Sequence, residues 1–213
     1  MPLSYRLVKN FKLIKILGCL VILIGCSLNL FSKNLKQNQE EAIMKGPLKI
    51  SADETISKEH GQIIEASGKV HVNYLMDSGD TLESFSKFAR YDEKAGIGEL
   101  FGNPKAIWKS KDSRYTQTTL TADNIRLKLK GSELFAKGNV IVVQSSNTLT
   151  ADEIEYSNSE KKMTASGGRP EFDIIEPKQH TKISADEIVA WTEKKQIHFN
   201  RKVQGIIILT SEK

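Results

Sequence analysis

The amino-acid sequence predicts an all-β fold, an elongated open roll of about five stacked hairpin-like units that follows an N-terminal signal or anchor segment. A short Ser/Thr-Ala-Asp motif recurs along the chain about thirty residues apart. Between its copies, apolar and polar residues alternate with the period of two that is typical of half-buried strands. No convincing helical stripe interrupts this pattern, which predicts roughly ten short strands.

Each repeat begins with the Ser/Thr-Ala-Asp motif and ends with a glycine at a constant offset. The three complete copies are Ser51-Ala52-Asp53 with Gly68, Thr121-Ala122-Asp123 with Gly138, and Thr150-Ala151-Asp152 with Gly167. Ser184-Ala185-Asp186 is followed by Arg201 instead of glycine, and a degenerate copy at Ser86 has Lys87 for aspartate and ends at Gly102. We expect the aspartate to bond nearby backbone at a corner, and the glycine to mark a bend in a strand.

The unit that follows Asp123 shows the strand pattern most clearly. Its apolar positions are Ile125, Leu127, Leu129, Leu134, Ala136, Val140 and Val142, and basic residues alternate with the first three. Gly131-Ser132 is a short turn signal, so this unit is predicted to be a hairpin. The charged stretch 192–196 is interpreted as another hairpin loop.

Residues 1–25 are predicted to be a signal peptide or membrane anchor. Four basic residues precede an apolar run that closes with Leu23-Ile24-Gly25-Cys26. This ending matches the bacterial lipobox, which implies cleavage before Cys26 and lipid attachment to its sulfur. Ile16-Leu17-Gly18-Cys19 is a poorer match, because almost no apolar run would precede it. An uncleaved anchor helix and a cleaved soluble protein stay open as alternatives, and all three send the domain across the inner membrane.

The formal net charge of +5 belongs largely to this leader, because four of the positive charges lie in residues 1–25. The remaining chain is close to neutral and gives no electrostatic argument for nucleic-acid binding. Both cysteines lie at Cys19 and Cys26, so the exported part holds no disulfide. Polar residues 26–46 predict a flexible tether, and residues 47–213 predict one domain large enough to bury a core.

The repeated elements resemble the OstA-like family of periplasmic lipopolysaccharide-transport proteins, of the LptA and LptC type. The resemblance rests on Ala66-Ser67-Gly68-Lys69-Val70, Ala136-Lys137-Gly138-Asn139-Val140 and the segment Leu149–Tyr156, and it covers about Ile50 to Val203. It implies an open elongated β-jellyroll with an apolar groove along its length. It also implies that acyl chains of lipopolysaccharide bind in this groove, and that like domains join edge to edge between the two membranes.

A groove of this kind would be lined by the apolar positions of the alternating strands. The candidates are Ile64, Val70, Val72, Ile125, Leu127, Leu134, Val140, Val142, Ile188, Ile197 and Phe199. The same alternation is expected of an ordinary packed core, and the sequence does not separate the two.

The segment 205–210 is uncharged, contains no proline and has strong β propensity. An exposed strand of this composition favours pairing with another chain, through Ile206, Ile207, Ile208 and Leu209. An internal strand, or one covered by a loop, is the alternative.

No combination of residues predicts catalysis or metal binding. One aspartate per repeat is too sparse for calcium, and His60, His71, His180 and His198 lack metal spacing. We therefore predict a non-enzymatic protein without cofactor or metal. Its expected partners are lipopolysaccharide or a related glycolipid, other jellyroll proteins, copies of itself joined end to end, and the membrane. The alternative function is a structural envelope lipoprotein that binds proteins through its edge strands without carrying lipid.

Overall fold

The computed structural model describes residues 48–75, 79–112, 117–128, 133–157, 159–191, 194 and 196–209. These residues form sixteen antiparallel strands of one sheet and a short 3-10 turn, Glu59–Gly61. Within them, no helix is long and apolar enough to cross a membrane. The predicted leader, Cys26 and the tether lie outside the described residues, as does the turn signal Gly131-Ser132. The all-β prediction is confirmed. The predicted number of about ten strands was too low, because many units contain additional short strands.

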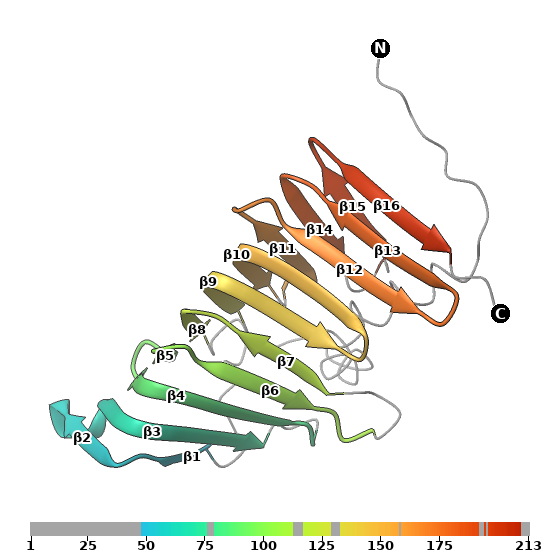
Figure 1. The fold of residues 1–213 in the computed structure, drawn as a ribbon. Helices are drawn as coiled ribbons and strands as arrows, with labels where there is room; N and C mark the ends of the chain where they lie inside the picture. The colour runs from blue at the N-terminus through green and yellow to red at the C-terminus, as the bar shows by residue number, and fades with distance from the viewer. Residues whose placement is uncertain are drawn as a thin grey trace, which may run out of the picture.

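Four long strands give the sheet its folded shape. They are β3 (Ile63–Leu75), β4 (Thr81–Asp92), β9 (Glu133–Gln144) and β10 (Asn147–Ser157). The two halves of each long strand pair with different neighbours: β3, for example, pairs with β2 through residues 63–67 and with β1 through residues 71–74. The sheet therefore folds along a line, here called the crease, into two layers that lie at an angle to each other (Figure 1).

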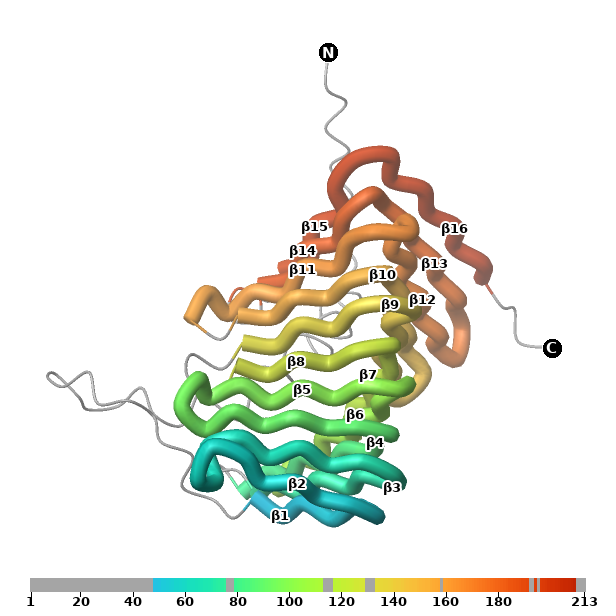
Figure 2. The backbone as a smooth tube through the Cα atoms, turned by 90° about the vertical axis from the view of Figure 1, so that its left-hand side faces the viewer, coloured from blue at the N-terminus to red at the C-terminus, as the bar shows by residue number. Residues whose placement is uncertain are grey.

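Layer I contains the N-terminal halves of β3 and β9 and the C-terminal halves of β4 and β10. Its other strands are β2 (Glu54–Lys58), β5 (Ile97–Phe101), β8 (Asn124–Lys128), β11 (Lys162–Ser166), β14 (Glu187–Trp191) and β15 (Gln196–Asn200). Layer II contains the other halves of the long strands. Its remaining strands are β1 (Leu48–Ser51), β6 (Lys105–Lys109), β7 (Thr118–Thr121), β12 (Glu171–Glu176), β13 (Gln179–Ser184) and β16 (Gln204–Leu209). Figure 2 shows the strands stacked along one long axis, as the predicted elongated roll requires.

The repeated motif builds the crease. In each copy that has the aspartate, its main-chain N–H donates to the carbonyl oxygen at the glycine position. The four bonds join Asp53 to Gly68 (2.8 Å), Asp123 to Gly138 (2.8 Å), Asp152 to Gly167 (3.3 Å) and Asp186 to Arg201 (3.1 Å). The predicted corner is thus held by a main-chain bond across the crease.

Glycine suits this position for two reasons. Gly68 has a φ of +71°, in the left-handed region that residues with a Cβ adopt less readily. A Cβ at Gly68 would also lie 2.6 Å from Oδ2 of Asp53, closer than atoms can pack. Arg201 has a φ of 61° in the last copy, so the chain keeps the same bend there without glycine.

The hydrophobic core lies between the two layers. Its large, almost fully buried apolar side chains include Val70, Ile125, Val140, Leu149, Phe172 and Ile188. Most of the buried cluster belongs to strands β5 to β14. Val72, Leu82 and Ala89 of β3 and β4 pack against it only partly buried, as do Ile197 and Phe199 of β15. The interior is therefore filled in the middle of the stack and less covered toward both of its ends.

Candidate functional site

Four rows of side chains face the space between the layers, because the strands pair in continuous register and one residue per strand aligns across each layer. In layer I, row A lies nearer the crease and row B lies farther from it. Row A is Thr55, Ala66, Ala89, Leu100, Ile125, Ala136, Ile154, Ala165, Ile188 and Phe199. Row B is Ser57, Ile64, Tyr91, Gly98, Leu127, Leu134, Tyr156, Met163, Ala190 and Ile197.

Layer II contributes two further rows. Row C lies nearer the crease and is Ile50, Val72, Ser84, Ala106, Leu120, Val142, Leu149, Phe172, Ile183 and Gly205. Row D lies farther out and is Leu48, Tyr74, Leu82, Trp108, Thr118, Gln144, Asn147, Ile174, Thr181 and Ile207. None of the four rows contains a charged residue, so the inner face is apolar with a few uncharged polar positions.

The register places every predicted groove residue on this inner face. Ile125, Ile188 and Phe199 belong to row A; Ile64, Leu127, Leu134 and Ile197 belong to row B; Val72 and Val142 belong to row C; Val70 and Val140 lie at the crease. The residues at the crease and in the middle of rows A and C are buried. The predicted residues of row B are only half-buried, so they offer apolar surface that the protein itself does not cover.

Open space borders row B at Gly98 on β5. A Cβ built at Gly98 would meet no atom within 4 Å, although the flanking row positions are Tyr91 and Leu127. Gly98 and Tyr91 were not among the predicted lining residues, because a glycine interrupts the apolar alternation that identified the others. Gly98, Tyr91 and Leu127 thus form a half-buried part of the inner face in layer I.

Burial raises the pKa of the Tyr91 phenol above its usual value of 10.0, and the nearby Glu93 and Asp92 carboxylates raise it further. The folded state therefore holds this proton more tightly than the unfolded chain does. We expect stability to be unaffected below pH 10 and to fall as the pH rises above it. Absorbance titration at alkaline pH should show one late-titrating phenol that Tyr91→Phe removes; an unchanged titration would contradict this assignment.

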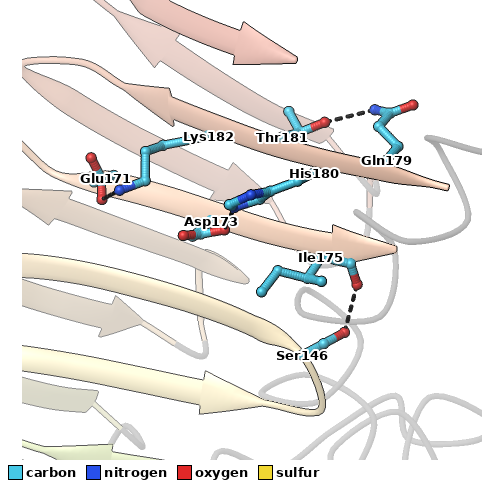
Figure 3. A network of polar contacts seen from close by, with 8 residues as sticks. All are labelled: Ser146, Glu171, Asp173, Ile175, Gln179, His180, Thr181 and Lys182. Atoms are coloured by element: carbon cyan, nitrogen blue, oxygen red, sulfur yellow. Dashed lines mark hydrogen bonds and ion pairs between the residues drawn. The ribbon is translucent and has the colours of Figure 1, made fainter. Parts of the chain in front are cut away.

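The outer faces carry paired charges, in contrast to the inner face. On layer I, Arg90 and Arg126 flank Glu99 at 3.7 Å each. On layer II, Lys182 lies 2.7 Å from Glu171 and His180 lies 2.6 Å from Asp173, between strands β12 and β13. Figure 3 shows these contacts. The hydrogen bond from Lys182 to Glu171 raises the pKa of the lysine. The charged side chains of the strands therefore lie on the outer faces, which also carry exposed apolar side chains such as Phe88 and Val143.

Two hollows lie on the outer faces near the N-terminal strands. One, of about 500 Å³, is bordered by Lys49, His71 and Leu75, and the other, of about 270 Å³, by Ile56, Phe88 and Phe101. Neither lies between the layers, so neither belongs to the predicted groove.

Comparison with known families gives an independent result. Residues 119–205 match the family described as LptA/(LptD N-terminal domain) LPS transport protein. This part of the chain is therefore similar to the OstA-like lipopolysaccharide-transport family. The resemblance found in the repeated Ala-x-Gly-x-Val elements is thereby confirmed for the second half of the repeat region.

The OstA-like domain is also similar to a solved structure. This structure is LptH from Pseudomonas aeruginosa, described as the LptA homologous periplasmic component of the conserved lipopolysaccharide transport device. The two share 16% sequence identity with a TM-score of 0.52, over 63% of this chain and 98% of the LptH chain. At this identity the likeness concerns the fold, and it supports the predicted jellyroll. No curated protein sequence matches the chain.

The OstA-like domain exposes strand edges at both ends of its sheet. In the described residues, β16 pairs only with β13 and β15 only with β14, whereas β1 and β2 each pair only with β3. The predicted edge residues Ile206, Ile207, Ile208 and Leu209 are all exposed, Leu209 by 75%. Strand β16 therefore has a free edge and uncovered apolar side chains.

Side chains that could bind a metal do not gather in the described part of the OstA-like domain, where no group of three or more His, Cys, Asp or Glu residues has suitable geometry. His71 contacts Glu83 at 3.1 Å, and His180 contacts Asp173. Trp191 packs edge-on against His198. His71, His180 and His198 thus each contact a neighbouring side chain of the sheet.

Proposed function

We propose that this protein is a periplasmic component of lipopolysaccharide transport that carries acyl chains between its two layers. The family match and the fold shared with LptH support the general role. The observation that carries the proposal is the half-buried part of row B, where Ile64, Leu127, Leu134 and Ile197 lie on the inner face without full cover from the protein. Burial of one acyl methylene contributes about 0.8 kcal/mol, so a chain laid along such a row would be held firmly.

The groove residues are proposed to act in two ways. Val70, Ile125, Val140, Val142 and Ile188 form the buried floor near the crease and maintain the angle between the layers. Ile64, Val72, Leu127, Leu134, Ile197 and Phe199 are half-buried and would contact the acyl chains. The paired charges on the outer faces keep these faces compatible with water.

The free edges support a second part of the proposal, that like domains pair end to end. Strand β16 would meet β1 or β2 of the next domain, adding main-chain hydrogen bonds as in β-augmentation. The partner is either another jellyroll protein of the transport route or a second copy of this chain. Attachment of the domain to the membrane through a lipid on Cys26, or through an uncleaved helix, remains part of the proposal.

Strand β16 equally supports the alternative of a scaffolding envelope protein that binds other proteins without carrying lipid. Its exposed apolar side chains need only a protein partner, and the middle of the stack is already filled. The two functions differ in one respect that can be measured: only the carrier brings lipid into contact with row B.

Crosslinking from Leu127 tests the carrier function. A photoreactive residue at Leu127 should form adducts with lipopolysaccharide, whereas one at the adjacent outward position Lys128 should not. Gly98 is the cross-strand neighbour of Leu127, and a Cβ there meets open space, so Gly98→Trp should fill the groove without disturbing the fold. We expect Gly98→Trp to reduce the Leu127 adduct about tenfold, because an indole displaces several methylenes.

Gly98→Ala is the matched control, since it changes the backbone in the same way but leaves the space open. Its adduct yield should equal that of the wild type. Equal labelling at Leu127 and Lys128, or full labelling of Gly98→Trp, would contradict the carrier function and favour the scaffold.

A further inference from the structure

Row D contains a polar segment inside an otherwise apolar interior. Thr118 of β7, Gln144 of β9 and Asn147 of β10 are direct cross-strand neighbours. Gln144 is only 2% exposed and Asn147 only 7%. These side chains face the same space as the acyl-lining rows, so their polarity needs a physical reason.

The hydrogen-bonding capacity of Gln144 and Thr118 is not met. Among the described residues, neither Nε2 nor Oε1 of Gln144 has a hydrogen-bond partner, and Oγ1 of Thr118 has none either. Thr181, in the same row, differs because Nε2 of Gln179 donates to its hydroxyl at 2.6 Å. Buried polar groups are nearly always paired, and leaving them unpaired destabilises the fold. These three atoms lie on two adjacent strands and are available to a polar group from outside the described residues.

The chemistry of that partner follows from the atoms. The Gln144 amide offers a donor and an acceptor side by side, and the Thr118 hydroxyl can act as either. Toward the crease, the same strands present Leu120, Val142 and Leu149 of row C. The ligand must therefore combine an apolar chain with a nearby group that both donates and accepts, which describes an amide or a hydroxyl but not an ester.

We propose that Gln144 and Thr118 form a polar site for the amide or hydroxyl group of a bound acyl chain. This inference rests on the proposed carrier function and deepens it. The site fixes how deeply the chain enters, with its apolar part against row C and its polar linkage at row D. It also makes the groove selective for amide-linked or hydroxylated acyl chains over plain esters.

The test uses the full chain and displacement of a fluorescent fatty acid by three probes of equal chain length. These are N-methyltetradecanamide, methyl 3-hydroxytetradecanoate and methyl tetradecanoate. The wild type should bind the amide, the hydroxy ester or both about threefold to tenfold more tightly than the plain ester, as expected for one hydrogen bond. Which of the two is preferred identifies the group that the site recognises.

Gln144→Leu should remove this preference, because leucine keeps the volume but cannot form hydrogen bonds. It should also raise the thermal stability of the lipid-free protein, since two unpaired polar atoms disappear. Val143→Leu, at the adjacent outward position, is the control and should keep the preference. A preference that survives in Gln144→Leu, or equal binding of all three probes by the wild type, would overturn the polar site while leaving the carrier function intact. Failure of every probe to bind would overturn both.

Discussion

Replacement of Phe172 by alanine is expected to lower the free energy of unfolding by about 3–5 kcal/mol. Phe172 lies on β12 with only 1% of its surface exposed, and its cross-strand neighbours in row C are Leu149 and Ile183. Its ring fills the space where layer II meets the core, so truncation removes buried apolar surface and leaves a cavity. Urea denaturation followed by circular dichroism would measure the change.

Ile175→Ala on the same strand is the matched control. Ile175 is 52% exposed, so its truncation should change stability by no more than about 0.5 kcal/mol. Equal effects of the two substitutions would show that the interior at β12 is not packed by Phe172. In that case the filled middle of the stack, and with it the division into core and groove, would need revision.

The alternation of apolar residues was sufficient to predict which side chains face inward. Ile125, Leu127, Leu134 and Val142 were assigned to one face from the period of two alone, and the register places them there. This succeeds because the side-chain period of a strand is fixed by local geometry. The glycine bends were predicted for the same reason, since a left-handed φ is a local property.

The depth of each inward residue could not be predicted from the sequence. Ile125 is buried and Leu127 is half-buried, although they are two residues apart on one strand with similar side chains. Their difference depends on distance from the crease, which arises from pairing between residues far apart in the chain. Gln144 was missed for another reason: it continues the inward parity of Val140 and Val142, but apolar alternation identifies only apolar residues.

A pair of proline substitutions on β16 should separate folding from association. Adjacent residues of an antiparallel strand direct their main-chain N–H groups to opposite sides. Of Ile206 and Ile207, one therefore directs its N–H toward β13 and the other toward the free edge. Proline removes the N–H, so Ile206→Pro and Ile207→Pro should have different effects.

The substitution that removes the N–H directed toward β13 should lower the free energy of unfolding by about 1–3 kcal/mol, because the carbonyl group on β13 loses its hydrogen bond. The substitution that removes the N–H directed toward the free edge should leave the free energy of unfolding nearly unchanged. It should raise the dissociation constant of end-to-end association about tenfold. Sedimentation equilibrium of the full chain, alone and mixed with a jellyroll partner, would measure association, and thermal unfolding would measure stability. If neither proline changes association, the β16 edge is not the pairing surface, and its exposed isoleucines must serve a contact made through the face of the strand.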